Sequence, residues 1–248
     1  MHSWRNFVDK CKRYMPLENF EKRGLLITIP ILAFIFSFRE WGVETFNPAA
    51  GIRNFLITIL LVCVAFLVHE LSHRVIGLWL GYRTQYKAWI TGLVIGLVVA
   101  FVSNGRLPFI ATGSLVITHL EIHRLGKGFH DLSYHHLGWI AMAAPIMNML
   151  FAVLLKIIYT LTGIGVLEKL MMISIWIALF DMLPIPPFNG SRTFFGSRYV
   201  YVYVLGSLVG CAALLHYVSG LVSIISSLVL GGLVLAVFFI FVDKRWTA

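Results

Sequence analysis

The sequence predicts an all-α polytopic membrane protein with about six transmembrane helices and a re-entrant or β-like hairpin at about residues 88–120. Two observations lead to this fold class. The 248 residues are 59% hydrophobic and 12% charged, with a mean hydropathy of +0.85, which lies outside the range of a soluble domain of this size. The apolar residues also form long runs separated by short basic segments, which is typical of a chain that crosses a bilayer repeatedly.

Residues 1–24 are polar and basic, with aromatic residues interspersed. We expect them to form a cytoplasmic segment, either on the membrane surface or disordered. Residues 25–248 are expected to form a single transmembrane domain. The first predicted span needs polar neighbours at the interfaces, because its apolar run is shorter than a full crossing. The six predicted spans are residues 25–38, 55–80, 138–161, 166–180, 199–218 and 221–242.

Two stretches are predicted to depart from simple spans. Residues 39–54 form a short connection between the first two spans. Residues 89–102 and 107–120 are both apolar, but a polar break separates them, and the second stretch is rich in β-branched residues and Gly. A re-entrant or β-like hairpin therefore fits better than two full helices, provided that it lines a cavity of the protein itself.

The distribution of Lys and Arg sets the predicted orientation. With the N-terminus in the cytoplasm, fourteen of the Lys and Arg residues outside the spans fall on the cytoplasmic side, and the other three, Arg39, Arg53 and Arg106, fall opposite. We therefore expect a multi-pass plasma-membrane protein with both termini in the cytoplasm. The net charge of +9 does not indicate a nucleic-acid partner, because the basic residues do not form a patch with aromatic residues.

Cysteine usage and short motifs exclude several other classes. Cys11, Cys63 and Cys211 are far apart and form no Cys-x-x-Cys pair, so neither a disulfide framework nor a thiolate zinc site is indicated. The chain has no Ser-centred nucleophile motif, Walker loop or dinucleotide fingerprint. Several histidines could bind a second metal or sense pH, but are more simply interpreted as interfacial polar residues: His119, His123, His130, His135 and His136.

A His-Glu-x-x-His motif lies inside the apolar run at 55–80. On a helix, His69 and His73 lie about 6 Å apart along the axis, so both imidazoles can reach one metal ion. Glu70 is turned about 100° from that line, beside the metal, where a bound water would sit. Ionisable residues inside a span are costly and usually functional. The motif therefore predicts one zinc ion (Zn²⁺) per chain, with Glu70 as general base.

The polar loop at residues 180–192 is the place to look for the rest of the site, because a catalytic zinc needs a third protein ligand and an open position for water. Pro184, Pro186 and Pro187 forbid a regular helix there, so we expect the chain to run extended at membrane depth. Its unpaired backbone groups suit the binding of a substrate strand, and a plain interfacial turn is the alternative.

Three elements follow one another along the chain: His69-Glu70-x-x-His73, Pro145-x-x-Asn148 and Asp181-x-x-Pro184-x-Pro186-x-x-Asn189-Gly190. In this order they resemble the site-2 protease family of intramembrane zinc metalloproteases, in its archaeal and bacterial form. The resemblance covers most of residues 55–200, which would be the protease core. It implies that His69 and His73 bind zinc and that Glu70 is the catalytic base. Asn148, Asp181, Pro184 and Pro186 would surround the metal and the substrate.

The loop departs from the family pattern at one pair of positions. The family usually has Asn at the position of Asp181 and the metal-binding Asp at the position of Asn189, so this chain carries the pair exchanged. Asn189 offers only a neutral amide oxygen, which is a poor zinc ligand. Three interpretations stay open: Asn189 binds through that oxygen, Asp181 supplies the carboxylate, or the protein is a weakened or non-catalytic relative without a third ligand.

The motif and the resemblance together imply a zinc metalloendopeptidase that hydrolyses a peptide bond in transmembrane substrates, as in regulated intramembrane proteolysis. Its partner would be a membrane protein with a locally unwound transmembrane helix, because an intact helix keeps its amides hydrogen-bonded. The alternative is a non-catalytic protease-like protein that binds a membrane partner. Intact Glu70 argues against that alternative and Asn189 argues for it. The sequence carries no signal of the oligomeric state, the substrate or the cut site.

Overall fold

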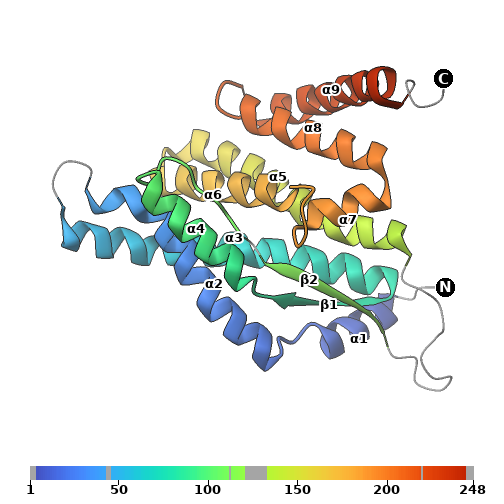
Figure 1. Ribbon diagram of the computed structural model, residues 1–248, viewed down its shortest axis with the longest axis horizontal. Helices are drawn as coiled ribbons and strands as arrows, with labels where there is room; N and C mark the ends of the chain where they lie inside the picture. The colour runs from blue at the N-terminus through green and yellow to red at the C-terminus, as the bar shows by residue number, and fades with distance from the viewer. Residues whose placement is uncertain (1–3, 43–45, 112, 121–132, 219, 244–248) are drawn as a thin grey trace.

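The computed structural model describes residues 4–42, 46–111, 113–120, 133–218 and 220–243 (Figure 1). Helices dominate the described chain, and two strands form one small sheet. In chain order the elements are α1 (Trp4–Tyr14), α2 (Asn19–Ser37), the 3₁₀-helix η1 (Phe38–Trp41), α3 (Pro48–Leu80), β1 (Tyr82–Lys87), α4 (Ile90–Val102), β2 (Ser114–His119), α5 (Tyr134–Thr162), α6 (Gly165–Asp181), α7 (Asn189–Gly196), α8 (Arg198–Leu214), α9 (Gly220–Phe238) and the π-helix η2 (Phe239–Asp243).

Four helical stretches in the described residues are long and apolar enough to cross a membrane, as the sequence predicted for a helical membrane protein. The predicted spans at 166–180 and 199–218 correspond to α6 and α8, which have 17 residues each. Because a full crossing takes about 20 residues, the number of six crossings stays a prediction. The four stretches are Asn19–Trp41, Pro48–Leu80, Tyr134–Thr162 and Gly220–Val242.

Helix α3 begins at Pro48, so the prediction of a connection over the whole of residues 39–54 was wrong. The Asn47 side chain accepts a hydrogen bond from the Ala50 amide at 3.1 Å and caps the helix. Pro48 occupies the first turn, where its missing N–H is not needed. The 33-residue helix ends at Leu80, and the next residue, Gly81, caps it with a φ of 87°, which suits a glycine.

Strands β1 and β2 pair antiparallel, with Tyr82 opposite His119 and Lys87 opposite Ser114. The predicted all-α class with a β-like hairpin is consistent with this single two-stranded sheet. The predicted hairpin at 88–120 is right only in its second half, where β2 contains Val116 and Ile117, whose branched side chains favour strands. Its first half is helix α4, and the partner strand β1 precedes the predicted range.

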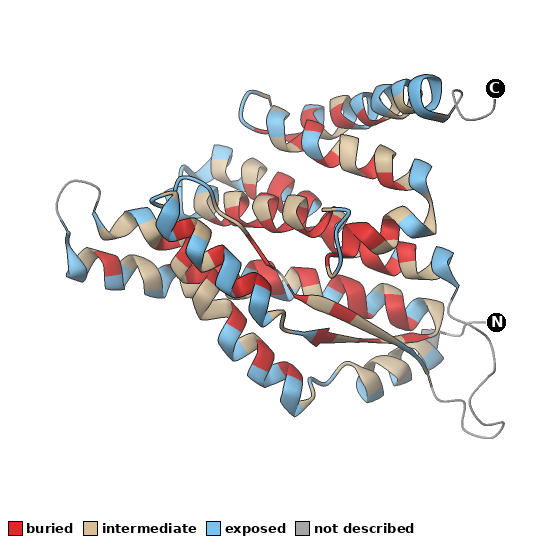
Figure 2. Cartoon of the chain, viewed as in Figure 1, coloured by how far each residue is buried: buried red, intermediate tan, exposed pale blue. Residues whose placement is uncertain are grey.

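The most buried part of the molecule lies where α5 packs against α3, α6 and α7. Figure 2 shows buried positions concentrated on these helices, whereas α9 is mostly exposed. Helices α8 and α9 pack chiefly on each other and lie along one edge of the molecule (Figure 1). The buried region joins segments that are far apart in the sequence, and the predicted site residues of α3, α5 and α6 all fall within it.

Candidate metal centre

Helix α3 places its two motif histidines in the buried interior. His69 and His73 are 2% and 1% exposed, and their ring centroids lie 4.9 Å apart, as the four-residue helical spacing requires. The Nδ1 of His73 lies 2.8 Å from the Ile140 carbonyl oxygen of α5. Because a carbonyl only accepts, this Nδ1 carries the proton, and the Nε2 of His73 keeps a lone pair for a metal.

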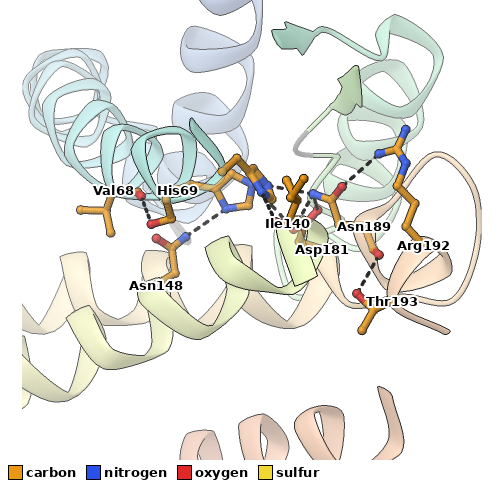
Figure 3. A network of polar contacts seen from close by, with 10 residues as sticks. Val68, His69, Ile140, Asn148, Asp181, Asn189, Arg192 and Thr193 are labelled. Atoms are coloured by element: carbon orange, nitrogen blue, oxygen red, sulfur yellow. Dashed lines mark hydrogen bonds and ion pairs between the residues drawn. The ribbon is translucent and has the colours of Figure 1, made fainter. Parts of the chain in front are cut away.

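His69 meets α5 at Asn148, about two helical turns beyond Ile140 (Figure 3). The side-chain amide nitrogen of Asn148 lies 3.4 Å from Nδ1 of His69, and its amide oxygen is buried without a hydrogen-bond partner among the described residues. Turning the amide over would let that oxygen accept a hydrogen bond from a protonated Nδ1. His69 would then present its Nε2 to a metal, in the manner that metal-binding histidines commonly show.

Asp181 completes a cluster of three candidate ligands. It is the last residue of α6 and is fully buried. One ligand atom each from His69, His73 and Asp181 lie within 4.8 Å of one another, and Nε2 of His69 is 3.6 Å from Oδ2 of Asp181. Ligand atoms about 2.0–2.2 Å from a tetrahedral zinc lie about 3.3–3.6 Å apart. The distance between His69 and Asp181 matches this spacing, and two imidazoles with one carboxylate are a ligand set that zinc takes with one position open.

Asn189, at the start of α7, turns its amide nitrogen toward this cluster (Figure 3). The nitrogen donates to both carboxylate oxygens of Asp181, at 3.0 and 2.9 Å, and lies 3.1 Å from Nε2 of His73. The amide oxygen points the other way and accepts from Nη1 of Arg192 at 3.1 Å. This arrangement fixes the orientation of the amide, because only its nitrogen can donate to a carboxylate.

The Pro-rich loop does not run extended, contrary to the prediction. The Leu183 amide donates to the Phe180 carbonyl at 3.1 Å and the Phe188 amide to the Ile185 carbonyl at 3.0 Å, so the chain turns. The prolines do exclude helix there, but the turn brings α7 back against the end of α6. A Cβ on Gly190 would collide with the Met182 carbonyl. Pro184 and Pro186 lie on the exposed side of this loop.

Glu70 is half-buried beside the cluster. It interacts electrostatically with Asp181, Arg74 and Glu21, and within the described residues its carboxylate makes no hydrogen bond or ion pair. Sequence reasoning missed two of these neighbours, Arg74 and Glu21. The available signals were the ionisable Arg74 directly after the motif and the Glu18-x-x-Glu21 pattern before an apolar run, which is typical of a helix start.

The other histidines do not gather into a second ligand cluster in the part of the chain that the structure describes. His123 and His130 lie outside the described residues. His136 contacts the Tyr82 hydroxyl at 3.0 Å through Nδ1, and Nε2 of His135 accepts from the Trp139 indole at 2.9 Å. The second metal site therefore stays without support.

Comparison with known proteins found a similar zinc metalloprotease-named sequence. No protein-family model matches the chain, and no solved structure matches it. The chain is 29% identical over 205 residues to a Methanocaldococcus jannaschii protein named "putative zinc metalloprotease", and the match covers 79% of this chain and 96% of that protein. Over most of its length the chain is thus similar to a protein with a zinc metalloprotease name, in agreement with the resemblance that the motifs predicted.

Proposed function

We propose that the protein is an intramembrane zinc metalloprotease that hydrolyses a peptide bond in a transmembrane substrate. The observation that carries the proposal is the buried cluster of His69, His73 and Asp181 with Glu70 beside it. The cluster involves α3, one of the helices apolar enough to cross a membrane. The zinc metalloprotease name of the similar protein supports the same class of reaction.

Asp181 is the third metal ligand in this proposal, and Asn189 is its partner. The amide nitrogen of Asn189 faces the site and has no lone pair to offer a metal. Arg192 holds the amide oxygen away, and the two bonds from Asn189 keep the Asp181 carboxylate directed at the histidines. The exchange of acid and amide thus keeps one carboxylate at the cluster, delivered from the end of α6 instead of the start of α7.

The zinc ion, when bound, would lower the pKa of a water toward about 7 and polarise the scissile carbonyl. Glu70 accepts the proton of the attacking water and returns it to the leaving amine, as a general base and then a general acid. Asn148 and the Ile140 carbonyl hold the histidine rings by their Nδ1 atoms, so that each Nε2 points into the site.

The substrate in this proposal is a membrane protein whose transmembrane helix unwinds locally, because helical amides are otherwise hydrogen-bonded. The turn between α6 and α7 has polar backbone groups next to the site and could pair with such a segment. The location is the plasma membrane, with both termini cytoplasmic, as the Lys and Arg distribution predicts. A cysteine added after Ala248 should then resist labelling from outside intact cells, and efficient labelling would contradict this orientation.

The proposed function is tested by comparing wild type with Glu70→Gln on a transmembrane substrate that contains Gly or Pro. We expect about one zinc per chain in both proteins, and a rate at least about 10²-fold lower in the variant, because the proton acceptor is lost. Equal and negligible cleavage by both proteins would contradict the hydrolase.

A binding protein without catalysis is the second candidate, and one observation favours it. The Asn189 amide contacts His73 and Asp181, so these buried polar groups have partners within the protein itself. Zinc content separates the two candidates: a protein purified without chelators that holds no zinc, and gains none on addition, would be the binding protein.

A further inference from the structure

A buried ion pair lies directly beyond the zinc-binding motif. Arg74 follows His73 on α3 and is 5% exposed, and Glu21 on α2 is fully buried. Nη2 of Arg74 lies 2.5 Å from Oε1 of Glu21, although the residues are 53 positions apart in the sequence. Charges are removed from water at a large free-energy cost, so a buried pair persists only where hydrogen bonds complete it.

Further hydrogen bonds do complete the pair. Oε1 of Glu21 also accepts from the Tyr86 amide of β1 at 2.8 Å, and Oε2 accepts from the Glu18 amide at 2.8 Å. Nη1 of Arg74 donates to the Met15 carbonyl at 2.8 Å. The link from α1 and the start of α2 thus both meet the Arg74 guanidinium of α3, and strand β1 meets the carboxylate that pairs with it.

A second carboxylate lies on the same helix as this guanidinium. Glu70 and Arg74 lie four residues apart on α3, a spacing at which acidic and basic side chains on a helix commonly pair. The two groups interact electrostatically. The guanidinium nevertheless bonds to Glu21 and Met15, and within the described residues no hydrogen bond or ion pair joins it to Glu70.

We propose that Glu21 is a positioning residue for Glu70, because it holds the Arg74 guanidinium away from the Glu70 carboxylate. This inference rests on the proposed role of Glu70 as proton acceptor. A carboxylate bound to arginine cannot also bind a water through the same oxygen atoms, since charge-assisted hydrogen bonds occupy their lone pairs. Glu21 thereby leaves the Glu70 carboxylate available to the water.

The first test compares the kinetics of Glu21→Gln with those of the double variant Glu21→Gln, Arg74→Gln. In the single variant the guanidinium loses its charged partner and turns to Glu70, so we expect kcat to fall at least about 10-fold, with KM and zinc content unchanged. The double variant removes the guanidinium as well and should recover kcat to within about threefold of wild type. A loss that the double variant does not recover, or no loss at all, would overturn the proposal.

Glu18→Gln is the matched control. Glu18 lies on the same segment, and its carboxylate pairs with Arg83 and accepts from the Gln85 side chain at 2.9 Å. The variant weakens the attachment of the segment to β1 but leaves Arg74 paired with Glu21. We expect kcat of Glu18→Gln to stay within about twofold of wild type. A loss of kcat equal to that of Glu21→Gln would mean that the attachment of this segment to β1 controls the rate, and it would overturn the proposal.

The second test needs no catalysis and uses thermal unfolding of the zinc-depleted protein. With Glu21 present, Glu70→Gln should shift Tm equally whether residue 74 is Arg or Gln, because the two side chains are not paired. In the Glu21→Gln background, Glu70→Gln should lower Tm by about 2–4 °C more when Arg74 is present, the effect of about 1 kcal/mol of new pairing. If, also in the Glu21→Gln background, Glu70→Gln shifts Tm equally whether residue 74 is Arg or Gln, the proposal is overturned. If wild type cleaves no substrate but the additional loss of Tm with Arg74 is observed, only the proposed function is overturned, and the role of Glu21 stands.

Discussion

Helices α5 and α9 are both apolar enough to cross a membrane, yet they are used in opposite ways. In α5, 56% of the apolar window is buried inside the molecule, against 11% in the stretch that contains α9. Helix α5 brings Asn148 and the Ile140 carbonyl to the candidate metal centre. Helix α9 packs chiefly on α8 through small residues such as Gly231, and leaves large side chains such as Leu233 exposed. Hydropathy thus identifies a membrane helix but does not tell which one faces the site.

The largest expected effect distinguishes Asp181 at the end of α6 from Asn189 at the start of α7. Asp181→Asn should lose zinc and proteolysis together, because the carboxylate of the proposed ligand set is removed. Asn189→Ala should be milder, with zinc affinity reduced by about 10–100-fold, the effect of losing a partner of a ligand. Zinc content by elemental analysis and the cleavage rate are measured for both.

If instead Asn189→Ala loses zinc and Asp181→Asn keeps it, Asn189 is the third ligand. In that case Asn189→Asp would tighten zinc and raise the cleavage rate, because a charged oxygen would replace a neutral one.

The histidine pair gives the next test. The double variant His69→Ala, His73→Ala should contain no stoichiometric zinc, since it removes two of the three proposed ligands. Retention of about one zinc per chain would mean that the metal binds elsewhere and would end the role of the motif as a metal site.

Asn148→Leu tests the contribution of α5 to the centre. Without the amide, Nδ1 of His69 loses its polar neighbour, and zinc affinity should fall by about 10–100-fold. Competition with a chelator measures this affinity. An unchanged zinc affinity would mean that Asn148 serves only in packing. The side chains of α5 would then contribute as little to the metal centre as those of α9.

The smallest effects are expected at α9, and they concern stability alone. A Cβ on Gly231 would collide with the Ser207 hydroxyl of α8, so Gly231→Val should destabilise the protein by about 1–3 kcal/mol. The exposed Leu233 is the matched control, and Leu233→Ala should change stability by less than about 0.5 kcal/mol. Both variants should keep their zinc. Loss of zinc in Gly231→Val would show that the α8–α9 pair supports the centre.

Much of the site was open to prediction because it depends on local periodicity. The spacing of His69 and His73 predicted two ligands on one helix face, and the structure brings their rings together. The prolines predicted a break in helix after Asp181, and the break is present. Residues this close in sequence have few ways to be arranged once the helix is given.

The sequence by itself determined the membrane class, the histidine pair with Glu70, and the resemblance to the metalloproteases. Only the tertiary structure decided which way the Asn189 amide turns, that β2 pairs with β1, and that Arg74 bonds to Glu21. Each of these features depends on a partner from a different part of the chain. The sequence pattern around Arg192 and Glu21 does not predict which residue each of them binds. Buried polar groups need hydrogen-bond partners, and only the packing of distant segments determines which partners they find.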